Sequence, residues 1–89
     1  MRKIDLTKKA RKFLNGLPAK QFRQIVKKIF SLLENPDPQD AKQLKGYPYL
    51  RTDTGEYRII YRFDDETVYV LLVGKRNDDE VYAKLRRMK

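Results

Sequence analysis

The chain contains no cysteine and no histidine among its 89 residues. Without cysteine it has no disulfide bond, no thiolate nucleophile and no thiolate metal ligand. Without histidine it lacks the usual proton carrier near neutral pH and the commonest protein ligand for metal ions. Most ordinary hydrolase and ribonuclease mechanisms are therefore excluded, and any hydrolytic chemistry must use lysine, arginine, tyrosine or carboxylate side chains.

Long apolar segments are missing as well. The longest apolar run, residues 68–73, is far shorter than the roughly 20 residues that span a bilayer, and the start of the chain has no apolar stretch typical of a signal peptide. Fingerprints for phosphate loops, dinucleotides and zinc are absent, and the one tight acidic cluster, residues 64–66, falls in a predicted hairpin turn. We therefore expect a single cytoplasmic domain over residues 1–89, without a membrane segment, metal or cofactor.

Positive charge is concentrated in the first third of the sequence. The chain has 21 lysine and arginine residues against 12 acidic residues, a formal net charge of +9. Residues 1–33 hold ten basic residues and the single acidic residue Asp5, whereas residues 34–89 hold eleven of each sign. A positive field of this size favours nucleic acid, a ribosome or an acidic protein as partner. The alternative is a basic surface that serves only solubility.

The first third of the chain is predicted to form a short strand followed by two helices. Polar and apolar residues alternate over residues 3–6, as in an edge strand, and Thr7 can cap a helix over residues 8–15 that stops at Gly16. Apolar residues at helical spacing predict a second helix from Pro18 to about Glu34. Its apolar stripe is Phe22, Ile25, Val26, Ile29, Phe30 and Leu33. The basic residues off this stripe, expected on the opposite side, are Lys20, Arg23, Lys27 and Lys28.

The rest of the chain predicts a three-stranded antiparallel meander and a last helix. Its strands are expected at residues 47–53, 57–63 and 67–73, with Thr54-Gly55 as the turn between the first two. The third strand has so little polar alternation that it should be buried on both faces. Residues 77–80 carry the capping and acidic side chains of a helix start, and Val81, Leu85 and Met88 follow at helical spacing. The whole order predicts an α+β fold: an N-terminal strand and a helical hairpin packed on a small, mainly antiparallel sheet, with a short C-terminal helix.

One face of the strand over residues 57–63 carries the first candidate for chemistry. Period two places Arg58 on the face opposite to the aromatic side chains, where Arg51, Arg76 and Tyr82 could join it. Guanidinium groups suit phosphate oxygens and stabilise charge that develops during phosphoryl transfer. In the alternative interpretation the arginines are separate surface residues that pair with nearby carboxylates, namely Asp53, Glu56 and Asp78.

Four segments in order and spacing resemble the RelE family of bacterial toxins. They are Leu44-Lys45-Gly46, Gly55-Glu56-Tyr57-Arg58-Ile59-Ile60-Tyr61, Val73-Gly74-Lys75-Arg76 and Glu80-Val81-Tyr82. The resemblance extends over nearly the whole chain, including the helical hairpin. It implies a cytoplasmic toxin of a type II toxin–antitoxin pair, and RelE itself cleaves mRNA in the ribosomal A site without histidine or metal.

The resemblance also assigns roles to individual residues. Arg58 matches the arginine that stabilises the phosphate, Arg76 the arginine that protonates the leaving 5′ oxygen or stabilises its charge, and Tyr82 the tyrosine that stacks on the mRNA base. Where RelE has two lysines, one of them proposed as the base, this chain has Tyr49 and Arg51. Because arginine rarely releases its proton, the base is left open between Lys45, Tyr82 and a weakly acting arginine.

We therefore expect a ribosome-dependent mRNA endoribonuclease in which the substrate's 2′-hydroxyl attacks the adjacent phosphate. The catalytic set is Arg51, Arg58, Arg76 and Tyr82, and the predicted RNA-binding residues are Lys20, Arg23, Lys27, Lys45 and Lys75. The expected partners are the 70S ribosome, mRNA and a cognate antitoxin whose acidic amphipathic segment blocks or displaces the last helix. One alternative is a ParE-like toxin that inhibits DNA gyrase without chemistry, against which Arg76 and Tyr82 argue; another is a plain RNA-binding module.

Overall fold

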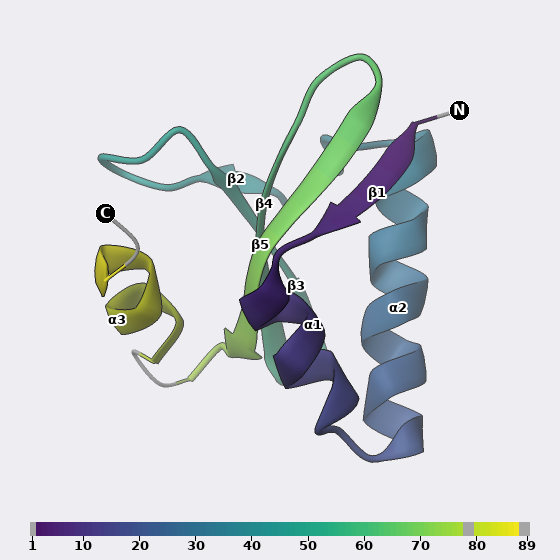
Figure 1. Cartoon of the computed structure of the whole chain (residues 1–89). Helices are drawn as coiled ribbons and strands as arrows, with labels where there is room; N and C mark the ends of the chain where they lie inside the picture. Colours follow the sequence, from purple (N-terminus) through teal and green to yellow (C-terminus); the bar gives the residue numbers. More distant parts are fainter. Residues whose placement is uncertain (1, 78–79, 88–89) are drawn as a thin grey trace.

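Five strands form one mixed sheet at the centre of the molecule (Figure 1). The computed structural model describes residues 2–77 and 80–87. Its elements are β1 (Lys3–Leu6), α1 (Lys8–Asn15), α2 (Ala19–Glu34), β2 (Lys42–Gln43), β3 (Leu50–Thr54), β4 (Tyr57–Phe63), β5 (Thr67–Lys75) and α3 (Glu80–Arg87). The strand order is β1-β5-β4-β3-β2, and only the pairing of β1 with β5 is parallel. The predicted α+β fold and mainly antiparallel sheet are confirmed.

Helices cover the sheet on both faces, with α1 and α2 on one side and α3 on the other (Figure 1). The larger core combines Ala10 and Leu14 of α1 with buried residues of α2 and the facing side chains of β4 and β5. The smaller core, on the other face, joins Val81 and Leu85 of α3 to Ile60 and to residues of β5 and the loop before β3. The last helix is therefore held by a separate and smaller apolar cluster.

Thr7 makes the connection between β1 and α1. Its Oγ1 accepts a hydrogen bond from the backbone N–H of Ala10 at 3.1 Å, which confirms the predicted cap, and donates one to the carbonyl of Leu71 at 2.5 Å. Gly16 follows α1 as its C-cap, as predicted. Because β1 ends at Leu6, it pairs with β5 only as far as Val70.

The helix α2 packs through a narrower stripe than its sequence predicts. Ile25, Ile29 and Leu32, at positions i, i+4 and i+7, are buried against the sheet. Phe22 and Phe30 are 37% and 58% exposed, so their prediction as core-facing residues is wrong. The reason is geometric: a helix lying on a sheet buries only the side chains that point at it, and the next row around the helix reaches solvent. Pro18 is the N-cap, one position before the first turn where it was expected.

The loop after α2 is tied to the sheet by two hydroxyl groups. The Tyr61 hydroxyl donates to the carbonyl of Pro36 at 2.7 Å, and burial raises the pKa of this phenol above its usual value. Thr52 donates to a carboxylate oxygen of Asp40 at 2.7 Å. These two bonds fix β3 and β4 relative to α2.

The strands β2, β3 and β5 differ from the sequence-based prediction, and β3 ends at Thr54, one residue later than expected. The two-residue strand β2 was not predicted; it pairs antiparallel with β3, with Lys42 opposite Arg51. β3 begins at Leu50 rather than at residue 47, because Pro48 has no N–H to donate and the preceding residues form a tight turn. Gly46 provides that turn with a φ of +83°. β5 extends to Lys75, two residues beyond the prediction.

An irregularity in the β4–β5 pairing lets both faces of β5 stay apolar. Ile60 pairs with Leu72 and Tyr61 with Val70, which leaves Leu71 as an extra residue in β5. Leu71 and Leu72 therefore both join the core under α3. The prediction that this strand is buried on both faces is confirmed.

No helix in the described residues is long and apolar enough to cross a membrane. The predicted capping residues Asp78 and Asp79, and Met88 at the helix end, lie outside the described residues.

Candidate functional site

The side chain of Arg58 is the centre of the site, on the face of the sheet that α3 covers. Its Nε donates to Oδ1 of Asp53 at 2.8 Å and its Nη2 donates to Oδ2 of the same residue at 3.1 Å. Its Nη1 donates to the hydroxyl of Tyr82 at 2.7 Å. These bonds use three of the five N–H donors of the guanidinium, which leaves two for an anionic ligand.

Asp53 lies opposite Arg58 in the β3–β4 hairpin, whose two turn residues are Gly55 and Glu56, one position later than the predicted Thr54-Gly55. Gly55 has a φ of +58°, so the two-residue turn fixes which residues face each other. The hydrogen bonds from Arg58 hold the pKa of the Asp53 carboxyl below its usual value against the opposing effect of burial, and the charges of the surrounding arginines lower it further. Asp53 is therefore ionised at neutral pH and a weak base.

The two other predicted arginines lie around the same carboxylate. Nη1 of Arg51 is 3.9 Å from Oδ2 of Asp53. Arg76 follows directly after β5, its backbone N–H donates to the carbonyl of Glu56 at 2.9 Å, and its side chain is exposed. Its charge also contributes to the lowered pKa of Asp53. The expected convergence of Arg51, Arg58 and Arg76 is present, and so is part of the alternative interpretation, because two of the arginines pair with Asp53.

The helix α3 brings Tyr82 to Arg58 because of Gly74. Gly74 pairs with Arg58 in the β4–β5 register, and a Cβ atom at this position would overlap with Cγ2 of Val81. The missing side chain lets α3 lie close to the sheet, where Val81 and Leu85 are almost fully buried. The centre of the Tyr82 ring is then 5.9 Å from the guanidinium carbon of Arg58. The two residues are joined by a hydrogen bond and by proximity of the cation to the ring.

The predicted RNA-binding residues do not gather at this site. Lys20, Arg23 and Lys27 are exposed on α2, which packs on the opposite face of the sheet from Arg58. They line an open groove of about 650 Å³ together with Gln24 and the apolar residues Phe22, Val26 and Phe30. Lys45 is exposed in the turn before β3 and Lys75 is exposed at the end of β5.

Two features of the site were not predicted as functional. Asp53 was considered only as a partner in surface pairs, because a turn at Thr54-Gly55 would have placed Arg51 opposite Arg58, whereas the turn at Gly55-Glu56 places Asp53 there. Gly74 was seen only as part of a motif, because its contact with Val81 depends on where α3 lies. Among the described residues no group of three or more histidine, cysteine or acidic side chains could hold a metal ion.

The chain matches known toxins over most of its length. Residues 4–80 match the family described as ParE toxin of the type II toxin–antitoxin system parDE. The mRNA interferase toxin RelE of Escherichia coli strain K12 is 33% identical over 86 residues, which cover 91% of this chain and 90% of that protein. The crystal structure of the isolated E. coli RelE toxin superposes with a TM-score of 0.74 at 29% identity and covers 100% of both chains.

Chains from two solved toxin–antitoxin complexes also have the same fold as this chain. The toxin–antitoxin complex from Mycobacterium tuberculosis gives a TM-score of 0.74 at 30% identity, covering 84% of this chain and 98% of that chain. The intact E. coli RelBE complex gives a TM-score of 0.73 at 29% identity, covering 88% of this chain and 100% of that chain. The family match, the identity to RelE and the shared fold together show that this chain belongs to the RelE family of type II toxins, within the RelE/ParE superfamily.

Proposed function

We propose that this toxin is a metal-independent endoribonuclease that cleaves mRNA in the ribosomal A site. The observation that carries the proposal is the partly exposed cluster in which Arg58 contacts both Asp53 and Tyr82, with Arg51 and Arg76 close by. Such a cluster holds the Arg58 guanidinium in place before the substrate arrives and adds further positive charge around it, an arrangement that stabilises a developing phosphate charge. The similarity to relatives named mRNA interferase supports the same reaction.

In the proposed reaction the 2′-oxygen of one nucleotide attacks the adjacent 3′-phosphate. The 2′-hydroxyl proton passes to a base, the new bond from the 2′-oxygen to phosphorus forms, and the bond to the 5′-oxygen breaks. The two free N–H donors of Arg58 neutralise the phosphate, and Arg76 stabilises the leaving 5′-oxygen, which takes a proton from solvent. The products are a 2′,3′-cyclic phosphate and a free 5′-hydroxyl.

The remaining residues position the reacting groups. The Asp53 carboxylate orients Arg58, and its lowered pKa makes it unsuited to accept the 2′-hydroxyl proton. The base is not assigned in this proposal: Lys45 lies in the turn before β3, and the hydroxyl of Tyr82 accepts a hydrogen bond from Arg58. The ring of Tyr82 stacks on the mRNA base in this proposal, and Arg51 adds positive charge near the phosphate.

The test is an mRNA with a single 2′-deoxy nucleotide immediately 5′ of the scissile phosphate, placed in the A site of a programmed ribosome. This substitution removes the proposed nucleophile and leaves the phosphate unchanged, so cleavage should stop. The matched control carries the deoxy nucleotide one position further along and should be cleaved normally. Cleavage of the first message at the normal rate would rule out the mechanism, and equal cleavage of free and ribosome-bound mRNA would rule out the dependence on the ribosome.

The proposed partner is an antitoxin with an acidic amphipathic segment that covers the groove on α2 and blocks or displaces α3. Phe22 and Phe30 expose apolar rings in this groove, and Lys20, Arg23 and Lys27 surround them. An apolar stripe bordered by cations matches a helix with one apolar and one acidic face. A second copy of this chain would bring another charge of +9 to the same place, which disfavours self-association.

The antitoxin proposal can be tested with the product of the neighbouring gene. Phe22→Ala combined with Phe30→Ala should weaken its binding by about 30-fold or more, as expected for central aromatic anchors, without unfolding a chain in which both rings are exposed. The control is Lys3→Ala combined with Lys8→Ala, two exposed residues outside this groove. If both double variants bind with unchanged affinity, α2 is not the docking surface. A neighbouring product that neither binds nor relieves toxicity would contradict the partnership itself.

The match to ParE toxins supports a second candidate function, inhibition of DNA gyrase without chemistry. That match ends at residue 80 and does not include Tyr82, whereas the likeness to the isolated RelE toxin covers 100% of the chain. A gyrase inhibitor has no need for the contact of Tyr82 with Arg58. Supercoiling by purified gyrase in the presence of this protein distinguishes the two functions, and we expect no inhibition.

A further inference from the structure

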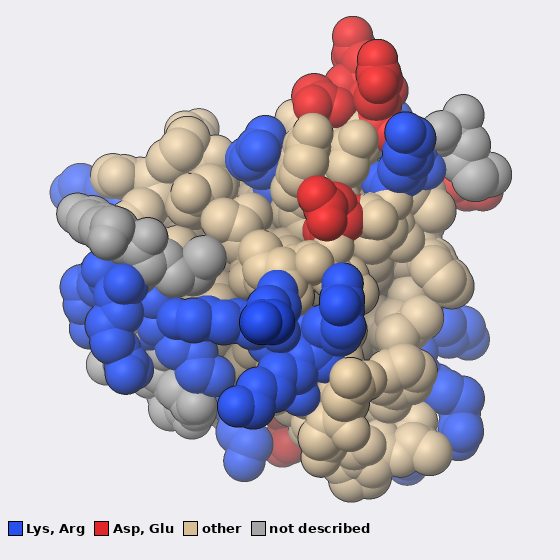
Figure 2. Space-filling view, in the orientation of Figure 1, with Lys and Arg blue, Asp and Glu red and all other residues tan. Residues whose placement is uncertain are grey.

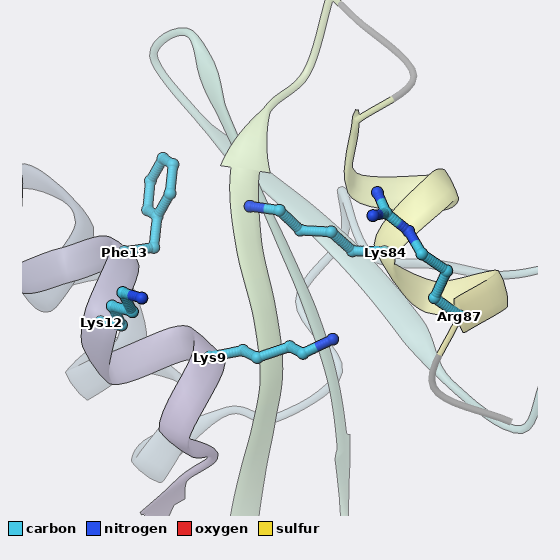
Figure 3. A pocket seen from close by; sticks show the side chains of 5 residues that line it. All are labelled: Lys9, Lys12, Phe13, Lys84 and Arg87. Carbon is cyan, nitrogen blue, oxygen red and sulfur yellow. The ribbon is translucent and has the colours of Figure 1, made fainter.

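A cleft lies between α1 and α3 (Figure 3), and none of the described residues that line it belongs to the proposed catalytic set. Its volume is about 360 Å³, within the range of cavities that hold small ligands or single nucleotides. Five side chains line it: Lys9, Lys12, Phe13, Lys84 and Arg87. Four of the five are cations and the fifth is an aromatic ring, so none of the described lining residues is acidic.

The cleft exists because β1 is short. β1 pairs with β5 only from Thr67 to Val70, and the chain then turns away into α1. The following part of β5 is flanked by α1 on one face of the sheet and by α3 on the other. Figure 3 shows β5 passing between the two helices, with Lys9 and Lys84 extending across it from opposite sides. Cations from distant parts of the sequence thus face one another across a strand edge.

The aromatic ring in the cleft, that of Phe13, is held in place by contacts with the larger core. Phe13 contacts Tyr57 edge to face, with ring centres 6.1 Å apart, and packs against the larger core. Nζ of Lys84 lies 5.4 Å from the centre of the Phe13 ring. A half-buried ring in a fixed orientation next to cations is the arrangement on which nucleic-acid bases stack.

Basic side chains also dominate the surface around the cleft. Figure 2 shows them in a continuous band over α3 and α1, whereas the acidic side chains at the top of the same view lie over the β4–β5 turn. Arg86 on α3 adds exposed positive charge beyond the lining residues. A chain of phosphates that enters the cleft therefore meets positive charge on both sides.

We propose that this cleft binds a single-stranded RNA segment, with phosphates on the four cations and a base stacked on Phe13. The lining decides between RNA and an acidic protein segment. An amphipathic helix needs an extended apolar stripe, which α2 offers with Phe22, Val26 and Phe30, whereas the α1–α3 cleft offers one aromatic ring among cations. Single-stranded RNA needs cations along its backbone and a ring for its bases, and the cleft provides both.

RNA bound in the cleft would also stabilise the position of α3. Lys84 and Arg87 face the cleft, while Tyr82 on the same helix contacts Arg58. In the described residues the sheet holds this helix through a small apolar core and through the contacts of Arg58 with Tyr82. A phosphate backbone bridging α1 and α3 would add contacts on the opposite side of the helix from Tyr82. The binding site is nevertheless independent of the cleavage reaction and would exist in a protein without that activity.

The experiment measures binding of a fluorescein-labelled 2′-O-methyl oligouridine of about ten nucleotides to the full chain by anisotropy. The 2′-O-methyl groups remove the nucleophile, so the measurement does not depend on cleavage. The test variant is Lys9→Gln combined with Lys12→Gln. The matched control is Lys8→Gln combined with Arg11→Gln, which removes the same charge from the same helix at the same spacing but outside the cleft.

The test variant should bind more weakly than the control, and its plot of log affinity against log salt concentration should be shallower by about 1.4, the value for two phosphate contacts on a single strand. Phe13→Leu should weaken binding about 5- to 150-fold through loss of stacking, whereas Phe13→Tyr should retain it. Thermal unfolding of each variant shows whether the fold is intact. Equal losses in the test and control variants, or full affinity of Phe13→Leu, would overturn the proposal.

Two further experiments, a competition with an acidic peptide and a pelleting assay with ribosomes, identify the ligand. An acidic peptide of matched charge should compete poorly for the cleft; if it competes as well as RNA and is equally weakened in the Lys9→Gln, Lys12→Gln variant, the site is a protein-docking surface and the proposal fails. Pelleting with empty and with mRNA-programmed ribosomes distinguishes the sources of RNA. A defect of the variant on empty ribosomes assigns the cleft to ribosomal RNA, and a defect only on programmed ribosomes assigns it to mRNA.

Discussion

Nη1 of Arg58 donates a hydrogen bond to the hydroxyl of Tyr82 at 2.7 Å, and this bond connects the strand β4 to the last helix. The rest of the guanidinium is held by the Asp53 carboxylate through Nε and Nη2. The guanidinium is therefore fixed on one side by its neighbouring strand and on the other by a helix that packs on a small core. The position of α3 determines whether the proposed catalytic cluster is complete.

Substitutions of Tyr82 separate the role of its hydroxyl from that of its ring. Tyr82→Phe removes the bond to Arg58 and keeps the ring, so cleavage should fall modestly and the free energy of unfolding should fall by roughly 1.5 to 3 kcal/mol, as for a hydrogen bond to a charged group. Tyr82→Ala removes both and should reduce cleavage much further, because stacking on a base is lost. Single-turnover cleavage of programmed ribosomes measures the difference. Equal activity of the two variants would contradict a stacking role.

Arg76→Ala should abolish most growth inhibition without affecting the fold. The side chain is exposed and follows the end of β5, so it contributes little packing. Loss of one cationic donor at a developing oxyanion lowers the rate about 10²- to 10³-fold. The control is Arg62→Ala: Arg62 is an exposed arginine on β4 whose guanidinium carbon lies 3.9 Å from the centre of the Tyr69 ring, away from the cluster. Full toxicity of a well-expressed Arg76→Ala chain would remove Arg76 from the proposed catalytic set.

The features that depend on local sequence were predicted well. The cap at Thr7, the end of α1 at Gly16 and the period of two in β4 each follow from a few adjacent residues, and the structure has all of them. The hairpin turn was predicted at Thr54-Gly55 but lies at Gly55-Glu56, and this shift of one residue places Asp53 instead of Arg51 opposite Arg58. The period of two nevertheless predicted that Arg51 and Arg58 share one face of the sheet.

The features that depend on distant parts of the chain could not be predicted. Periodicity shows that Phe22, Ile25 and Ile29 lie on neighbouring rows of α2, but only the angle at which α2 meets the sheet decides which row is buried. The two-residue strand β2 has no pattern of its own and forms because β3 offers an edge. The cleft between α1 and α3 needs both the early end of β1 and the position of α3, which are set by different segments.

The pairing of Asp53 with Arg58 predicts how stability depends on pH. Because the pKa of Asp53 is lower in the folded protein than its usual value of 3.8, the folded state favours the ionised carboxylate. The resulting stabilisation is fully present above about pH 5 and is lost as the pH falls through the folded pKa. Asp53→Asn should lower the free energy of unfolding by roughly 1 to 2 kcal/mol at pH 7, since the pair is only partly shielded from solvent. Near pH 2 the difference between variant and wild type should be much smaller.

Urea unfolding at a series of pH values measures this difference. The control is Asp5→Asn, which removes an exposed carboxylate from β1, an edge strand separated from β3 by β5 and β4, and in which the effect of the Asp53–Arg58 pair should persist. A destabilisation by Asp53→Asn that stays constant from pH 7 to pH 2 would show that the hydrogen bonds, and not the charge, are the source of the effect.

Gly74→Ala tests whether the position of α3 controls activity. An added Cβ would overlap with Cγ2 of Val81, so the helix must move away from the sheet, and overpacking of this kind usually costs about 1 to 3 kcal/mol. The displacement should pull Tyr82 from Arg58 and reduce cleavage more than it reduces the amount of folded protein. Circular dichroism at the assay temperature gives the folded fraction against which the cleavage rate is compared.

A second substitution distinguishes displacement of α3 from general damage. Val81→Ala removes the methyl groups that the new Cβ would meet, so the double variant Gly74→Ala, Val81→Ala should recover much of the cleavage rate even though Val81→Ala alone loses buried apolar surface. The two effects must then be non-additive, because the residues touch. If the double variant is as inactive as the sum of the single variants implies, contact between Gly74 and Val81 does not set the position of Tyr82, and the link between the helix and the cluster fails.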